Sequence, residues 1–205
     1  MSGEFQSMFQ YAIGDECEPG PSFVPPAWLG PPSDELGWAV ALSLVVARSE
    51  QAVVALRQAN AYSTGVVFDV VSQARGLSPR EAHNLMHEQH VYPHDEEPAP
   101  GFLRVGVELA DGARASNLGT RRPPPTIDKE PEGPVLMQIG GGGGSADEGS
   151  ATFDERYWLW PLPPSGSIRI YVEWPRFGID LSPAEIDSGV LLDAARRSRN
   201  LWAAP

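Results

Sequence analysis

The feature that most constrains the fold is a strictly alternating run of eight residues, 167–174. Its large apolar side chains fall at every second position: Ile168, Ile170, Val172 and Trp174. A period of two is typical of an antiparallel strand with one buried face. A second strand-like run, residues 157–160, precedes it across the proline-rich stretch 161–166. Because proline cannot donate a ladder hydrogen bond, the prolines delimit both runs, and we expect the runs to pair as the central hairpin of the domain.

Valine-rich stretches in the first half of the chain predict further strands. Residues 38–47 are almost continuously apolar, residues 52–56 follow a charged turn, and residues 65–73 are rich in valine. Valine favours strands over helices. The alternative for part of this region is a helix through residues 51–61, because Ala, Gln and Arg are good helix formers.

A second alternating run, residues 103–109, is followed by the dipeptide Asp111-Gly112. This dipeptide favours a two-residue hairpin turn. Residues 114–118 are therefore expected to return as the partner strand, and residues 135–139 add another short strand.

A capping box predicts where the first helix begins. Ser78 precedes Glu81 by three residues, and Pro79 occupies the first helical position between them, a pattern typical of a helix N-terminus. The helix is expected to end before Pro93, because a residue that precedes proline disfavours the helical conformation.

The same pattern, Ser182-Pro183-Ala184-Glu185, predicts a C-terminal helix with Ser182 as its N-cap. We expect this helix to dock on the sheet through an apolar face formed by Ile186, Val190 and Ala194.

Together these elements predict a mainly β (α+β) protein. We expect an antiparallel β-sandwich or a strongly curved sheet, with the C-terminal helix packed on it and one short inserted helix. Residues 1–33 are rich in proline and are interpreted as a flexible arm, and residues 34–205 as a single β-rich domain. Flexible loops are expected at 93–101, 119–133 and 140–150, the last because it contains five consecutive glycines.

Charge and cysteine content exclude several classes of function. The formal net charge of −12 opposes non-specific nucleic-acid binding and docking on anionic membranes. The single cysteine, Cys17, excludes an intramolecular disulfide and fits a reducing compartment. No signal-peptide pattern is visible, and the longest apolar run is too short for a membrane helix. We therefore expect a cytoplasmic protein that contacts neither nucleic acid nor a membrane.

The central motif resembles a family. A glycine run, the sequence YWLWPLPPSGSIRIYVEWPRFGI and a following helix that ends in Arg-Asn-Leu-Trp are similar to a family of uncharacterised actinobacterial proteins. The shared features are a poly-Gly stretch, a W-x-W-P-L-P-P-x-G hairpin and an E-W-P turn. The resemblance also includes residues 102–118 and covers about half of the chain. It supports the element boundaries and implies no activity.

Histidines supply the candidate metal site. His83, His87 and His90 would share one face of the first helix, and imidazoles spaced by four residues can chelate Zn²⁺ or Ni²⁺. The H-E-x-x-H pattern of metalloproteases is missing because Asn84 follows His83. We expect a solvated helix without metal, and a metal-dependent enzyme or metal-binding protein is the alternative.

Aromatic residues supply the candidate binding site. Both faces of the run 157–160 carry large side chains, so one face is either covered by another part of the chain or exposed to a partner. Interfaces favour Trp, Tyr and Arg, and the candidate binding residues are Trp158, Trp160, Tyr171 and Arg176. No catalytic residues are assigned and no cofactor is expected. We therefore interpret the chain as a non-catalytic protein-interaction module, with a small-ligand-binding β-sandwich as a further alternative.

Overall fold

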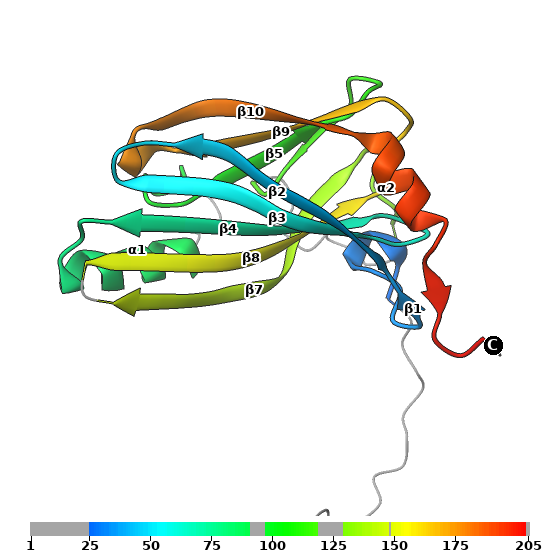
Figure 1. The fold of residues 1–205 in the computed structure, drawn as a ribbon, viewed down its shortest axis with the longest axis horizontal. Coiled ribbons are helices and arrows are strands. Elements are labelled where there is room, and N and C mark those ends of the chain that lie inside the picture. Colours follow the sequence, from blue (N-terminus) through cyan, green and yellow to red (C-terminus); the bar gives the residue numbers. More distant parts are fainter. Residues whose placement is uncertain (1–24, 91–96, 119–128, 148, 204–205) are drawn as a thin grey trace, which may run out of the picture.

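Two antiparallel sheets face each other in the computed structural model, which describes residues 25–90, 97–118, 129–147 and 149–203 (Figure 1). The larger sheet has the strand order β2-β3-β4-β8-β7, and the smaller has the order β10-β9-β5-β6. The predicted class, a mainly β protein with a C-terminal helix and one inserted helix, is confirmed.

The larger sheet contains β2 (Trp38–Arg48), β3 (Ala52–Ala61), β4 (Val66–Arg75), β7 (Val135–Asp147) and β8 (Ser150–Trp160). The smaller sheet contains β5 (Arg104–Glu108), β6 (Arg114–Ser116), β9 (Ser167–Trp174) and β10 (Ile179–Asp187). A separate two-stranded ribbon pairs β1 (Glu35–Leu36) with β11 (Arg199–Asn200). The strands predicted in the first half of the chain are thus confirmed, and β3 replaces the helix considered for residues 51–61.

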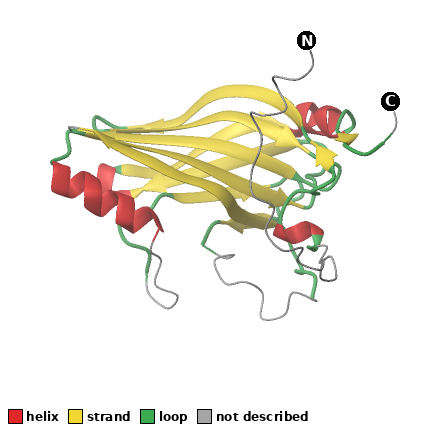
Figure 2. Cartoon of the chain, turned by 90° about the horizontal axis from the view of Figure 1, so that it is seen from below, coloured by secondary structure: helices red, strands yellow, loops and turns green. Residues whose placement is uncertain are grey.

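Two α-helices cover opposite ends of the strands: α1 (Pro79–His90) and α2 (Ser188–Ala195) (Figure 2). Short 3₁₀ turns form η2 (Ala27–Leu29) and η3 (Pro175–Phe177). The capping box of α1 is confirmed, because the Ser78 backbone N–H donates to a Glu81 carboxylate oxygen at 2.8 Å. In return, the Glu81 backbone N–H donates to Ser78 Oγ at 3.3 Å.

The core lies between the two sheets and is built from alternating residues. On β9, the predicted apolar face is buried: Ile168, Ile170, Val172 and Trp174. Trp174 also donates its indole N–H to the Gly101 carbonyl at 2.6 Å, so its one polar group is satisfied inside the core. The period-two pattern therefore identified the buried face of this strand correctly.

The central hairpin was a wrong prediction, because β8 and β9 belong to different sheets. β8 pairs with β4 and β7, whereas β9 pairs with β5 and β10. Residues 161–166 carry the chain from one layer to the other. An alternating pattern determines which face of a strand is buried and does not name the neighbouring strand, and six residues can span the roughly 10 Å between packed sheets.

The glycine run was also predicted wrongly, since residues 140–147 continue β7 and pair with β8 across two bulges. Helix α1 lies against this strand. A Cβ atom at Gly144 would lie 2.5 Å from the Met86 sulfur on α1. The missing side chain therefore lets the helix approach the strand closely.

The C-terminal helix begins later than predicted. Residues 182–187 pair with β9 as part of β10, with Ser182 opposite Val172 and Ile186 opposite Ile168. The N-cap is Asp187, whose carboxylate accepts from the Gly189 N–H at 2.8 Å. Sheet pairing has therefore overridden a local helix signal. The docking face differs too, because Leu191 and Ala194 are buried whereas Val190 is exposed.

The hairpin between β5 and β6 has a longer turn than predicted. The Leu109 N–H donates to the Ala113 carbonyl at 2.8 Å, and the Gly112 N–H donates to the Leu109 carbonyl at 2.9 Å. These bonds enclose three residues, 110–112, so Asp111-Gly112 forms part of a three-residue loop.

Candidate functional site

Two of the predicted binding residues, Trp158 and Trp160, are covered by the segment that precedes β1. Trp158 is fully buried, and its indole N–H donates to the Ala27 carbonyl at 2.9 Å. Trp160 is partly buried and meets Trp28 edge to face, with 6.0 Å between ring centroids. Residues 27–29 thus pack on the domain, although the sequence predicted a flexible arm for residues 1–33. Residues 1–24 of this arm lie outside the described part of the chain.

Tyr171, the third predicted residue, lies on the outer face of the smaller sheet. It lines a shallow depression of about 340 Å³ together with Arg169, Pro183, Ala184 and Glu185. The Arg169 guanidinium pairs with Glu108 at 3.1 Å and with Glu185 at 3.7 Å. A hydrogen bond to Tyr171, followed by these carboxylates, raises the pKa of Arg169. The charges of this surface are therefore paired with one another.

Arg176, the fourth predicted residue, connects two elements of the domain. Its guanidinium donates to a Glu88 carboxylate oxygen on α1 at 3.0 Å and lies 5.9 Å from the centroid of the Phe177 ring. These contacts give Arg176 a structural role between η3 and α1. The four predicted residues thus lie on β8, β9 and η3 and do not form one surface.

The candidate metal ligands lie on α1. His83 and His87 are exposed, and their ring centroids are 6.1 Å apart in an edge-to-face arrangement. The side chain of His90 lies outside the described residues. Among the side chains that are described, no group of three His, Cys, Asp or Glu residues could hold a metal ion. The metal-free helix stays a prediction.

The largest exposed apolar side chains at one end of the sandwich form a surface that we call the tryptophan patch: Leu36, Trp38, Leu201 and Trp202. Their exposed fractions are 59%, 40%, 55% and 86%, respectively. Monomeric proteins usually bury side chains of this size or use them in contacts with partners. The patch is therefore the strongest candidate for a binding surface in the described part of the chain.

The β1–β11 ribbon brings the two halves of the patch together. Leu36 is opposite Arg199 in the ladder, and the Leu201 N–H donates to the Asp34 carbonyl at 2.7 Å. Residues paired across an antiparallel ladder share a face, as do residues two apart on one strand. Leu36 and Arg199 therefore lie on the same side of the ribbon, and Leu201 and Trp202 follow in the turn directly after β11.

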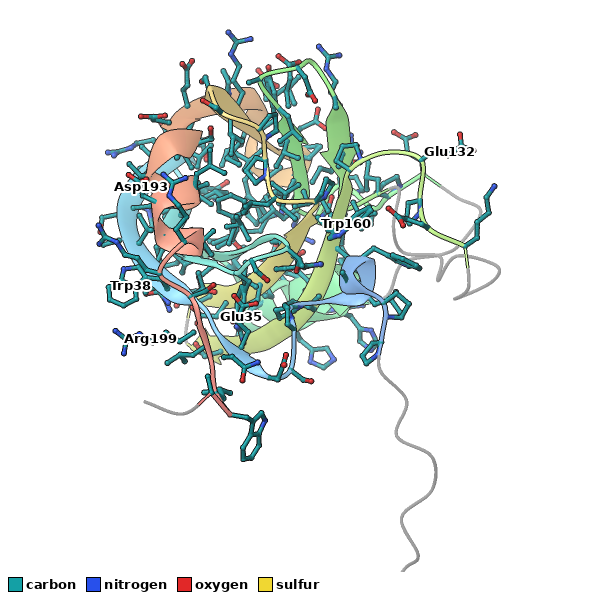
Figure 3. The ribbon with its side chains drawn as sticks, turned by 90° about the vertical axis from the view of Figure 1, so that its right-hand side faces the viewer. Glu35, Trp38, Glu132, Trp160, Asp193 and Arg199 are labelled. Carbon is teal, nitrogen blue, oxygen red and sulfur yellow. The ribbon has the colours of Figure 1, made fainter. Side chains whose placement is uncertain are left out.

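Two arginines border the patch. The Arg197 guanidinium lies 5.8 Å from the centroid of the Trp38 ring, a cation–π distance. Neither Arg197 nor Arg199 forms an ion pair with a carboxylate of the described residues. Trp38 and Arg199 lie on one side of this end of the molecule, away from Trp160 (Figure 3).

Reasoning from the sequence missed this surface because its members are far apart in the chain. Leu36 precedes the first long strand and Trp38 begins it, whereas Leu201 and Trp202 follow the last helix. The only signal was a Leu-Trp pair directly after an arginine-rich helix end, in a region where no strand was expected.

A comparison with family models, with curated proteins and with solved structures finds no match for this chain. The resemblance to an actinobacterial family therefore stays a prediction. In the described residues, neither α-helix has the length and apolar character required to cross a membrane.

Proposed function

We propose that the protein is a non-catalytic interaction module that binds another protein through the tryptophan patch. The observation that carries the proposal is the grouping of four exposed apolar side chains with two arginines that lack an ion pair among the described residues. Trp and Arg are the residue types most enriched among the side chains that dominate binding energies at interfaces.

The size of the patch fits the centre of an interface. A large aromatic side chain buries roughly 150–250 Å² when it is covered, and a stable interface buries about 800 Å² on each partner. Two tryptophans and two leucines supply a substantial part of that area. The remainder would come from the polar side chains that surround the patch.

The chemistry of the patch favours a protein partner. The chain carries a net charge of −12, which opposes phosphate-rich surfaces in general. Arg197 and Arg199 place positive charge beside the apolar groups, whereas the nearby carboxylates of Asp34 and Glu35 accept hydrogen bonds from Asn200 and Ser63. The patch therefore fits a partner that has both carboxylates and apolar side chains. With its single cysteine, Cys17, the chain fits a reducing compartment, and we propose that it acts in the cytoplasm.

Affinity capture with matched variants tests this proposal. The patch variant carries Leu36→Ser and Trp202→Ser, and the control variant carries Val45→Ser and Leu181→Ser, two exposed apolar residues outside the patch. We expect the parent and the control to retain the same protein, identified by mass spectrometry, and the patch variant to lose it. Equal retention by all three chains would refute the patch as the binding surface.

A further inference from the structure

We infer that residues 4–18 of the same chain bind the tryptophan patch. This inference rests on the proposed function, because it names an occupant for the same surface. An external partner then has to compete with the chain's own segment for the same side chains.

The composition of residues 4–18 complements the patch. The segment contains spaced apolar side chains (Phe5, Met8, Phe9, Tyr11 and Ile13), followed by a carboxylate cluster (Asp15, Glu16 and Glu18). Residues 1–24 contain no lysine and no arginine. The apolar part suits Leu36, Trp38, Leu201 and Trp202, and the acidic part suits Arg197 and Arg199.

The described chain begins at the same end of the sandwich as the patch, on the side of Trp160. Ala27 accepts a hydrogen bond from Trp158, and the Trp158 ring meets the Tyr62 ring edge to face at a centroid distance of 5.9 Å. A Cβ atom at Gly37 would lie 2.6 Å from the Tyr62 ring. Since Gly37 separates Leu36 from Trp38, the rings of Trp158 and Tyr62 connect Ala27 to the backbone of the patch.

The connecting chain is long enough for this contact. Residues 19–24 separate the acidic cluster from Pro25, and a chain spans up to about 3.3–3.6 Å per residue. Six residues therefore span roughly 20 Å, which is ample to pass two rings. The apolar residues 5–13 lie further from Pro25 and have a correspondingly longer reach.

The charges beside the patch favour an acidic segment as its occupant. Five arginines of the two large sheets are engaged by a carboxylate, as Arg169 is by Glu108 and Arg104 is by Glu173, whereas Arg48 and Arg75 have no such partner among the described residues. Arg197 and Arg199 have no such partner among the described residues. An acidic segment that reaches them gains charge-assisted contacts beside an apolar surface, where such contacts are less screened by water.

The single cysteine provides the experiment. A nitroxide spin label attached to Cys17 in the full-length, ¹⁵N-labelled chain broadens nuclear magnetic resonance signals of groups near it. We expect the indole N–H signals of Trp38 and Trp202 to lose most of their intensity, and the signal of the buried Trp174 to keep its intensity. Unchanged Trp38 and Trp202 signals would overturn the inference.

A charge-reversal variant separates docking from the mere closeness of a tethered segment. Arg197→Glu with Arg199→Glu should restore both indole signals, whereas Arg48→Glu with Arg80→Glu, which changes the charge equally, should leave the loss in place. A loss that persists in the first variant would contradict docking. A loss of equal size when the label and the ¹⁵N are on different molecules would also contradict it, because the occupant would then be a second copy.

The outcome is independent of the capture experiment. If a partner is captured through the patch and the Cys17 label leaves the Trp38 signal unchanged, this inference is wrong and the proposed function stands. If the label broadens the Trp38 and Trp202 signals but no protein is captured through the patch, the segment is the occupant and the proposed external partner is wrong.

Discussion

The indole N–H of Trp158 donates a hydrogen bond to the carbonyl of Ala27, at 2.9 Å and across 131 positions of the chain. This contact attaches the segment before β1 to the outer face of the larger sheet. It also explains why Trp158, which we predicted from the sequence to be a binding residue, is buried. The proposed binding surface therefore lies elsewhere, at the β1–β11 ribbon.

Trp158→Phe should lower the free energy of unfolding by about 2 kcal/mol, because the smaller phenyl ring leaves part of the indole space empty and the hydrogen bond to Ala27 is lost. Trp158→Ala should cost about 3–5 kcal/mol, since a large buried side chain is removed as well. Urea unfolding followed by circular dichroism measures both values. If the Phe variant matched the Ala variant, the hydrogen bond would matter more than the packing.

Trp174→Ala should lower the free energy of unfolding by about 3–5 kcal/mol, because Trp174 is fully buried beside Phe177. The matched control is Trp202→Ala, the same change at a highly exposed position, which should stay within about 0.5 kcal/mol of the parent. Thermal unfolding of the three chains provides the comparison. Equal melting temperatures for the two variants would show that one of the positions is misplaced.

Asp187→Ala should destabilise the protein by about 1 kcal/mol, because α2 loses its N-cap. Ser182→Ala should stay within about 0.5 kcal/mol, since the Ser182 hydroxyl only donates to the Asp180 carbonyl in an exposed strand. Chemical denaturation of both variants measures the difference. A larger effect at Ser182 would support the helix start that the sequence suggested.

Alkaline pH should destabilise the protein through Tyr62. Burial, with smaller contributions from Glu35 and Asp69, raises the pKa of Tyr62 above its usual value of 10.0, although Arg156 acts in the opposite direction. The stabilisation is complete below the pKa of the unfolded chain and is lost as the pH rises through the higher folded pKa, because the unfolded state releases its proton first.

Tyr62→Phe isolates this effect, since phenylalanine has no titrating proton. Urea midpoints should fall less steeply for this variant than for the parent between about pH 9 and pH 11, around the reference pKa of tyrosine. Parallel curves for the two chains would contradict the raised pKa.

The sequence predicted those parts of the fold that depend on local periodicity and local hydrogen bonds. The alternation at 168–174 identified the buried face of β9, and Ser78 with Glu81 identified the start of α1. Both signals act within a few residues. The class of the fold followed from the number and spacing of such runs, whereas the placement of β8 and β9 in different sheets did not.

Most of the failures involve pairing between strands, which the pattern within one strand does not specify. Ser182 has the sequence of a helix N-cap, but Val172 pairs with it across the sheet. The glycine run resembles a linker, but Phe153 and its neighbours on β8 pair with it as a strand. The patch depends on Leu36 and Leu201 meeting through a ribbon whose two strands lie at opposite ends of the described chain, which no local pattern reveals.

Position-specific photo-cross-linking tests the central claim, that the protein binds another protein through the tryptophan patch, most directly. A photoreactive amino acid replaces Trp202 in one chain and Leu181, exposed on β10, in the control chain, and both are irradiated in cells that produce the protein. We predict one dominant adduct with another protein from position 202, which disappears when Arg197→Glu and Arg199→Glu are added. The claim would be contradicted if position 202 gave no intermolecular adduct, or if position 181 gave the same adduct in equal yield.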